Sequence, residues 1–151
     1  MKNYNEGLEI DKTYPYLFLM RGELRLKQGN QDGAKEDFEM VVKLDTSVTD
    51  GSCRHYALHF LGKDDEAKEW MDKLIAEDPD DSGNYYDMAC LYSRMGKLDE
   101  AVDALRTAFE KGYRRFPHIE NDDDLDPIRS LPSFIELMEE YRLKHENFLS
   151  E

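Results

Sequence analysis

The sequence has few cysteines and no long apolar run, and each shortage excludes a class of protein. Two cysteines, Cys53 and Cys90, are too few for a disulfide framework, and they lack the CxxC spacing of a metal site. The longest apolar run, 16–20, is far shorter than the roughly 20 residues of a membrane span, and no basic-then-apolar export signal opens the chain. We therefore expect reduced thiols, no membrane insertion and a cytoplasmic-like setting, with the location of a longer parent protein left open.

Positive charge is scarce as well. The chain holds 20 Lys and Arg against 34 Asp and Glu, which gives a formal net charge of −14 over 151 residues. Such an excess of acid disfavours binding to nucleic acid and to anionic membrane surfaces, and favours a neutral or basic protein segment as partner. Hydrophobic residues still make up 40% of the chain, and nine Tyr and seven Phe supply large apolar surfaces. The chain is therefore expected to fold as one compact unit or a short repeat array.

Motifs of catalysis and of cofactor binding are absent from the sequence. It contains no GxGxxG, no GxxxxGKS or GxxxxGKT, no HExxH and no GxSxG. No residue set supplies a nucleophile together with its base. We therefore predict a chain that is not an enzyme and that carries no cofactor.

Two weaker patterns could bind a metal ion, and neither is complete. His55 and His59 have the i, i+4 spacing that offers two imidazoles to one ion, but no third or fourth ligand lies nearby in the sequence. The acidic run 122–126 lacks the glycine and the closing glutamate of a calcium loop. We expect no metal site, and we expect Asp126 to cap a turn that Pro127 opens.

Three segments of the chain superimpose without gaps and start at Gly29, Gly62 and Gly96, which lie 33 and 34 residues apart. An alanine follows each glycine five residues later, and a large apolar residue follows four residues beyond the alanine. The alanines are Ala34, Ala67 and Ala101, and the apolar residues are Phe38, Met71 and Leu105. A period of this length is typical of a solenoid of stacked supersecondary units.

Each unit of the repeat is predicted to be a helical hairpin. The first helix ends at the glycine, which adopts the left-handed conformation at the lowest cost. The second helix has acidic residues in its first turn and apolar residues at a spacing of three and four. The recurring small alanine lets the two helix axes approach to roughly 8–10 Å.

These residues resemble the tetratricopeptide repeat family. The first copy has the pattern at Phe18, Gly22, Gly29, Ala34 and Phe38, and the third copy has it at Tyr85, Ala89, Tyr92, Gly96, Ala101 and Leu105. The second copy departs from the pattern, with Gly51 in the place of the bulky residue and His55 in the place of a small one. The resemblance implies an all-α solenoid of helical hairpins, coiled as a right-handed superhelix and closed by a C-terminal capping helix.

The repeat pattern predicts a single array over residues 1–151. Its parts are a half repeat at 1–14, repeats at 15–48, 48–81 and 82–115, and a capping segment at 116–151, with the last helix at about 133–148. In the half repeat, Tyr4 and Leu8 align with Phe38 and Val42 and are expected to stay partly uncovered. We expect the chain to be part of a longer protein, and the half repeat offers a possible surface for a homodimer.

In this family the first helices line a concave groove, and the resemblance places nine residues of this chain there. They are Tyr16, Met20, Glu23, Tyr56, His59, Tyr86, Asp87, Cys90 and Arg94. Aromatic residues and Met dominate the set, which suits contact with a protein or peptide. The alternative for these residues is that a short array packs them against its own capping helix.

The sequence thus predicts a non-catalytic scaffold that binds a protein or a peptide in the concave groove. The alternative is a structural or oligomerisation appendage of a larger protein, with no ligand site of its own. Repeat folds serve many roles, so the fold narrows the class of function and leaves the partner open.

Overall fold

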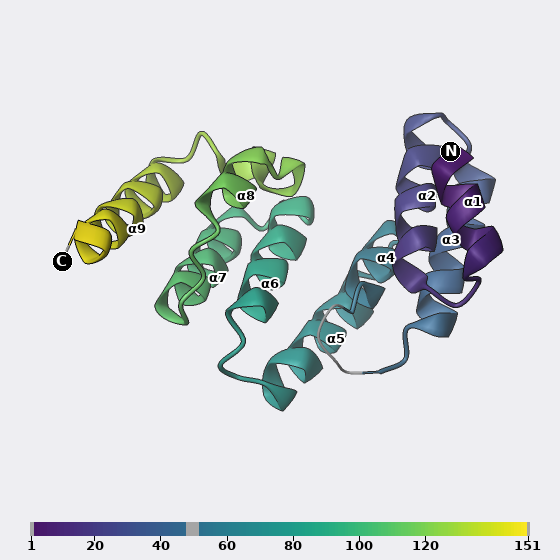
Figure 1. The fold of residues 1–151 in the computed structure, drawn as a ribbon, viewed down its shortest axis with the longest axis horizontal. Coiled ribbons are helices and arrows are strands. Elements are labelled where there is room, and N and C mark those ends of the chain that lie inside the picture. The colour runs from purple at the N-terminus through teal and green to yellow at the C-terminus, as the bar shows by residue number, and fades with distance from the viewer. Residues whose placement is uncertain (1, 48–51, 151) are drawn as a thin grey trace. The chain divides into compact units, whose positions relative to one another are not determined.

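The computed structural model describes residues 2–47 and 52–150, and every regular element among them is helical. The elements are α1 (Lys2–Ile10), α2 (Pro15–Lys27), α3 (Gln31–Leu44), α4 (Arg54–Phe60), α5 (Asp64–Glu77), α6 (Ser82–Arg94), α7 (Leu98–Glu110), α8 (Phe116–Asn121), the 3-10 helix η1 (Asp123–Ile128) and α9 (Pro132–Ser150). They form two compact units, 1–77 and 78–151 (Figure 1). The predicted all-helical repeat fold is confirmed.

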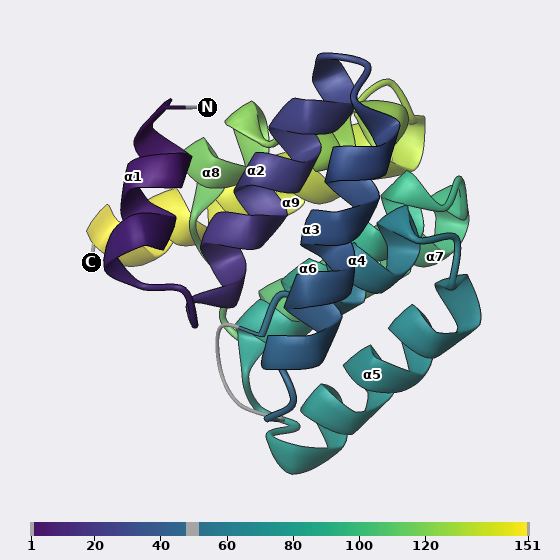
Figure 2. The same ribbon diagram turned by 90° about the vertical axis from the view of Figure 1, so that its right-hand side faces the viewer.

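In unit 1, α2 and α3 form the best-packed hairpin and lie side by side in both views (Figure 1 and Figure 2). The alanine of the repeat, Ala34, is completely buried, as its role in letting the helices approach requires. Phe38 of α3 is also buried, and its ring stacks on Phe60 of α4 with the centroids 4.6 Å apart. Gly22 of α2 lies against the ring of Phe38, so a side chain at this position would force the ring or the helix to shift.

The three repeat glycines end the first helices as predicted. Gly29, Gly62 and Gly96 have φ angles of 78°, 74° and 74°, which is the left-handed conformation. The following helix α3 is capped by Asn30, whose side chain accepts a hydrogen bond from the backbone N–H of Gly33. Glycine stops one helix and a short cap starts the next, which fixes the tight hairpin.

The first helix of the second repeat is short, in the copy whose sequence departs from the repeat pattern. Helix α4 has seven residues, whereas α2 and α6 have 13 each. His55 fills the small-residue position and is completely buried. The buried carboxylate of Asp45 accepts hydrogen bonds from the backbone N–H groups of Cys53 and Arg54, and so holds the start of α4.

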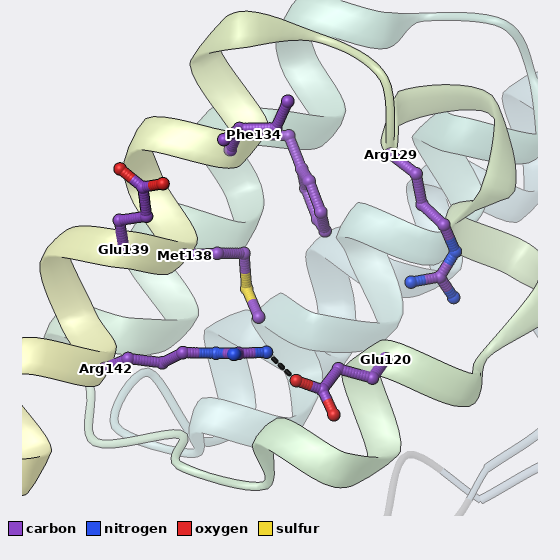
Figure 3. Close-up of a pocket in the computed structure, with 7 residues that line it drawn as sticks. Glu120, Arg129, Phe134, Met138, Glu139 and Arg142 are labelled. Carbon is purple, nitrogen blue, oxygen red and sulfur yellow. Dashed lines mark ion pairs between the residues drawn. The ribbon is translucent and has the colours of Figure 1, made fainter.

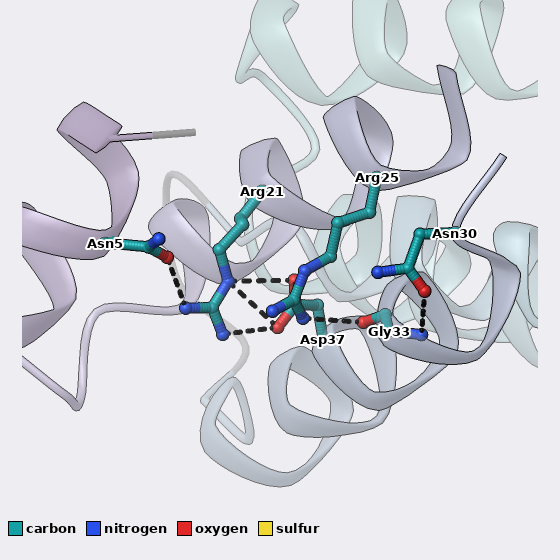
Figure 4. Close-up of polar contacts among 6 residues, drawn as sticks. All are labelled: Asn5, Arg21, Arg25, Asn30, Gly33 and Asp37. Atoms are coloured by element: carbon teal, nitrogen blue, oxygen red, sulfur yellow. Dashed lines mark hydrogen bonds and ion pairs between the residues drawn. The ribbon is translucent and has the colours of Figure 1, made fainter. Parts of the chain in front are cut away.

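A buried carboxylate also joins the helices of the first hairpin (Figure 4). Asp37 of α3 is 1% exposed, and it receives two N–H groups of the Arg21 guanidinium at 2.7 and 3.0 Å. A guanidinium nitrogen of Arg25 lies 2.9 Å from Oδ2 of the same carboxylate, and Arg25 donates to the carbonyl oxygen of Gly33. Arg21 also donates to the side chain of Asn5 in α1, so one network connects three helices.

Helix α1 packs against α2 as the half repeat predicts, but one expectation about it is wrong. Leu8 was expected to be partly uncovered, whereas it is buried in the same core as Phe18 and Leu19. Tyr4, the other residue of that expectation, is half-exposed. The reason is that α2 supplies enough apolar surface to cover the single leucine of α1.

In unit 2, the α6–α7 hairpin packs against the capping segment. Phe109 of α7 is completely buried and stacks on Tyr141 of α9 with the centroids 4.8 Å apart. The last helix spans Pro132–Ser150, close to its predicted extent. The predicted cap is wrong, because Asp122 caps η1 by accepting from the backbone N–H of Asp124, while Asp126 pairs with Arg129.

Candidate protein-interaction site

The first-helix face of unit 1 carries five of the nine predicted groove residues. On α2, Tyr16, Met20 and Glu23 follow one another at the i, i+4, i+7 spacing that places them on one side of the helix. Tyr16 is 47% exposed, and Met20 and Glu23 are half-buried. On α4, Tyr56 and His59 are half-buried as well. This face therefore combines accessible aromatic surface with one acidic group.

Side chains on α2 and α4 share contacts with one core. Met20 and Tyr56 both pack against the buried core of unit 1. Partial burial raises the pKa of the Tyr16 hydroxyl, and nearby Tyr4, Glu23, Tyr14 and Cys53 raise it further. Cys53 is the residue before α4, so this influence places the start of α4 close to Tyr16.

His59 is held at the edge of this surface. Its Nδ1 atom lies 2.7 Å from a carboxylate oxygen of Asp64, in the first turn of α5. The ring of His55, one turn earlier, lies against Tyr56 with the centroids 4.0 Å apart. His55 is buried and His59 contacts Asp64. Both rings therefore take part in the packing of unit 1.

In unit 2, Tyr86 and Cys90 face the chain's own capping segment instead of an open groove. Tyr86 is 3% exposed, and its hydroxyl donates a 2.6 Å hydrogen bond to the carboxylate of Asp122. Its ring stacks on Tyr113 with the centroids 4.4 Å apart. Cys90 is completely buried, and its Sγ atom lies 3.7 Å from the same carboxylate. Burial raises the pKa values of both side chains.

Arg94 and Asp87 complete the predicted set in unit 2. Arg94 forms an ion pair with Asp124 of η1, while Asp87 is half-buried on α6. One oxygen of each carboxylate, Asp122 and Asp124, and the Sγ atom of Cys90 lie within 4.8 Å of one another. The guanidinium of Arg94 supplies the positive charge beside this cluster, and burial raises the pKa of Asp124. Tyr86, Cys90 and Arg94 thus contact carboxylates of the capping segment.

Comparison with known proteins agrees with this architecture. Family models described as tetratricopeptide repeat match residues 16–45, 56–81 and 70–103. The chain belongs to the tetratricopeptide repeat family. Proteins of this family serve as scaffolds for protein interactions, and members of the family are generally non-catalytic.

Two of the proteins that are similar to the chain illustrate the extent of the likeness. A stretch of 93 residues is 30% identical to a chloroplastic protein of Arabidopsis thaliana, and it covers 60% of this chain and 27% of that protein. The chain thus spans little more than a quarter of this relative's length. The crystal structure of MamA is similar with a TM-score of 0.47 and 19% identity, over 98% of this chain and 88% of that one. Among the described residues, no helix is both long and apolar enough to cross a membrane.

A separate hollow of about 230 Å³ lies within unit 2, beside α9. Its lining residues are Glu120, Arg129, Phe134, Ile135, Met138, Glu139 and Arg142. Phe134 and Met138 point into the space between α9 and Arg129, and an ion pair between Arg142 and Glu120 closes one end (Figure 3). Ligand pockets usually measure roughly 300–1,000 Å³, so this hollow is smaller than a typical ligand pocket.

Sequence reasoning missed the polar residues that organise both units. Asp122 was seen as part of an acidic run, yet it receives the hydroxyl of Tyr86, 36 positions earlier in the chain. Asp45 and Asp37 were not singled out, although both are buried. Asp37 directly precedes the core residue Phe38 in the repeat pattern. This position was the sequence feature that could have indicated that Asp37 is buried.

The buried thiol of Cys53 predicts a loss of stability at alkaline pH. Burial, and next the carboxylate of Asp45, raise the pKa of Cys53 from 9.0 to about 12. The unfolded thiol ionises first, so the stabilisation is complete below pH 9 and is lost as the pH rises towards 12. A shift of one pKa unit corresponds to roughly 1.4 kcal/mol. Between about pH 8 and pH 10.5, the free energy of unfolding of the wild type should therefore fall by about 2 kcal/mol more than that of Cys53→Ala.

Urea unfolding measures this difference through Trp70, the single tryptophan of the chain, which lies in unit 1 and donates to Ser52. Other groups that titrate at alkaline pH are common to the wild type and Cys53→Ala, so the difference isolates the thiol. Parallel loss of stability in the two proteins over this pH range would contradict the assignment.

Proposed function

We propose that the chain is a non-catalytic scaffold that holds a neutral or basic segment of a partner protein against the first-helix face of unit 1. The binding surface consists of Tyr16, Met20 and Glu23 on α2 with Tyr56 and His59 on α4. The observation that carries this proposal is the exposure of Tyr16, which is 47% accessible beside half-buried apolar side chains. In unit 2 the capping segment covers Tyr86 and Cys90, so the proposal rests on unit 1.

The chemistry of this face supports contact with a peptide. Tyrosine offers a large, stiff surface at low conformational cost, and burial of one aromatic side chain contributes roughly 1.5–3 kcal/mol. Met20 adds a flexible apolar side chain that adapts to different partners. Glu23 and the net charge of −14 disfavour an acidic segment, which leaves neutral and basic ones.

A peptide library displayed on phage and selected on the full chain tests this function. We expect the selected peptides to bind Tyr16→Ala/Tyr56→Ala at least about tenfold more weakly than the wild type, since one buried aromatic ring is worth more than 1.4 kcal/mol. Titration calorimetry measures the affinities. The matched control is Tyr92→Ala, which removes a half-buried tyrosine from α6 in unit 2.

Two results would refute the proposal. One is equal affinity of the selected peptides for the wild type and the double variant, with the helical signal of both unchanged. The other is a library that yields no binder at all, which favours the alternative of a structural or oligomerisation appendage. Light scattering over a concentration series then tests for the homodimer through the N-terminal half repeat.

A further inference from the structure

We propose that unit 2 binds a zinc ion through Cys90 of α6, His118 of α8, and the carboxylates of Asp122 and Asp124 at the start of η1. We call these four residues the zinc cluster. The inference goes beyond the proposed function, which concerns the first-helix face of unit 1. It also departs from the expectation drawn from the sequence, which weighed only short-range metal patterns, whereas Cys90 and Asp122 lie 32 positions apart.

The ligand atoms of the zinc cluster lie close together. The Sγ atom of Cys90 and the Nε2 atom of His118 each lie 3.7 Å from Oδ2 of Asp122. One carboxylate oxygen of Asp124 lies within 4.8 Å of Sγ and of an oxygen of Asp122. A tetrahedral zinc ion has bonds of roughly 2.0–2.3 Å to N, O and S, so its ligand atoms stand roughly 3.3–3.7 Å apart. Small side-chain movements therefore suffice to close the cluster around an ion.

The mixture of donor atoms in the zinc cluster selects zinc over the hard divalent cations. Zinc binds the sulfur of cysteine, the nitrogen of histidine and carboxylate oxygens, and structural sites use four such ligands. Calcium and magnesium are bound through oxygen atoms. A site in which a thiolate and an imidazole accompany two carboxylates thus fits zinc.

The charges of these side chains leave a place for a divalent cation. Asp124 forms an ion pair with Arg94, while Asp122 accepts a hydrogen bond from the neutral hydroxyl of Tyr86. The two carboxylates together exceed the charge of the guanidinium by one negative charge. Zinc binding displaces the thiol proton of Cys90 to the solvent, which adds a second negative charge. The two positive charges of zinc balance both.

A buried hydroxyl on the same side of α6 is an independent indication of a ligand. Ser93 is 1% exposed, and its Oγ atom has no hydrogen-bond partner in the part of the chain that the structure describes. Native proteins usually provide a partner for such a group, because leaving it unsatisfied costs free energy. Ser93 follows Cys90 by three residues, which places both side chains on one side of the helix. The thiolate formed on zinc binding is an acceptor on that side.

The zinc cluster can be reached from the solvent. The side chain of His118 is 49% exposed, those of Asp122 and Asp124 are 17% and 16% exposed, and Cys90 is completely buried. An ion therefore meets the imidazole and the carboxylates before the thiol. The ring of His118 lies against that of Tyr86 with the centroids 5.4 Å apart, and this contact helps to orient the imidazole.

A titration of the reduced, metal-free full chain with Co²⁺ tests the inference. Cobalt occupies tetrahedral zinc sites, and a thiolate ligand gives it a charge-transfer band in the near ultraviolet. We expect this band to saturate at an equimolar amount of Co²⁺ and to disappear when Zn²⁺ is added. An excess of Ca²⁺ or Mg²⁺ should leave the band unchanged.

Matched variants connect the band to the zinc cluster. Cys90→Ser should lose the band, whereas Cys53→Ala removes the other thiol of the chain and should keep it. Loss of an outer-shell partner costs roughly 10–100-fold in metal affinity, so loss of a ligand in His118→Ala should weaken zinc binding at least about tenfold. The control is His145→Ala, which removes a half-buried histidine of α9. Titration calorimetry measures the zinc affinities.

Circular dichroism shows whether each variant is folded, and His118→Ala decides the question if Cys90→Ser is not, because His118 is half-exposed. Absence of the cobalt band in the wild type overturns the inference. So does a band that persists in Cys90→Ser, or an equal zinc affinity of the wild type and His118→Ala. The peptide selection addresses unit 1, so the proposed function can hold when zinc binding fails.

Discussion

Replacement of Gly22 with valine is expected to lower the free energy of unfolding of unit 1 by about 3 kcal/mol. A Cβ atom at this position would lie 2.6 Å from Cε1 of Phe38 and 3.0 Å from two further atoms of that ring. The ring cannot withdraw, because it is buried and stacked on Phe60. Urea unfolding followed by the fluorescence of Trp70 measures the effect in unit 1.

Comparison of Gly22→Ala with Gly22→Val separates the effect of overpacking from that of helix propensity. Alanine in a helix is favoured over glycine by roughly 0.5–1 kcal/mol, so Gly22→Ala should cost less than Gly22→Val. Gly7→Ala is the matched control, because its Cβ atom meets only the flexible end of Leu17 at 3.0 Å and should change stability little.

A double-mutant cycle with Phe38→Leu tests whether the two positions act on each other. Because leucine leaves room for a Cβ atom at position 22, the costs of Gly22→Ala and Phe38→Leu should add to more than the cost of the double variant, by about 1 kcal/mol. Additive costs would show that Phe38 is not the obstacle, as would equal stability of Gly22→Ala and Gly22→Val.

The hairpins could be predicted from the sequence because their determinants are local. Gly29 and Ala34 lie five residues apart and specify a helix end and a close helix contact by their own geometry. The substitution of a small residue by His55 likewise indicated that the second copy departs from the pattern, and α4 is short. Such features need no knowledge of distant partners.

The surroundings of the groove positions could not be predicted in the same way. Tyr86 meets Asp122 across 36 positions of sequence, and Arg94 meets Asp124 across a similar interval. The acidic residues of the capping segment look like a solvated turn in a chain of which 36% is charged. The three-dimensional structure, in which the capping segment packs against α6, is needed to see which groove residues the segment covers.

Removal of the Asp37 carboxylate should be as damaging as overpacking of the core. Asp37→Ala leaves the guanidinium groups of Arg21 and Arg25 close together and about four-fifths buried, without their shared counter-charge. Loss of one partner from a buried ion pair costs roughly 3–5 kcal/mol, and the partial exposure of both arginines reduces this to about 2–4 kcal/mol. Trp70 fluorescence during urea unfolding measures the loss, and Glu39→Ala on the exposed side of α3 is the matched control.

A triple variant separates the need for the charges from the need for the packing. In Asp37→Leu/Arg21→Met/Arg25→Met, no buried charge is left unpaired, and apolar side chains fill similar space. Replacement of a buried ion network by apolar residues is often neutral or stabilising, so the triple variant should be more stable than Asp37→Ala by about 2 kcal/mol or more. A triple variant as unstable as Asp37→Ala would show instead that other contacts of the two arginines hold α1, α2 and α3 together, such as the hydrogen bonds to Asn5 and Gly33 and the contact of Arg21 with the ring of Phe18.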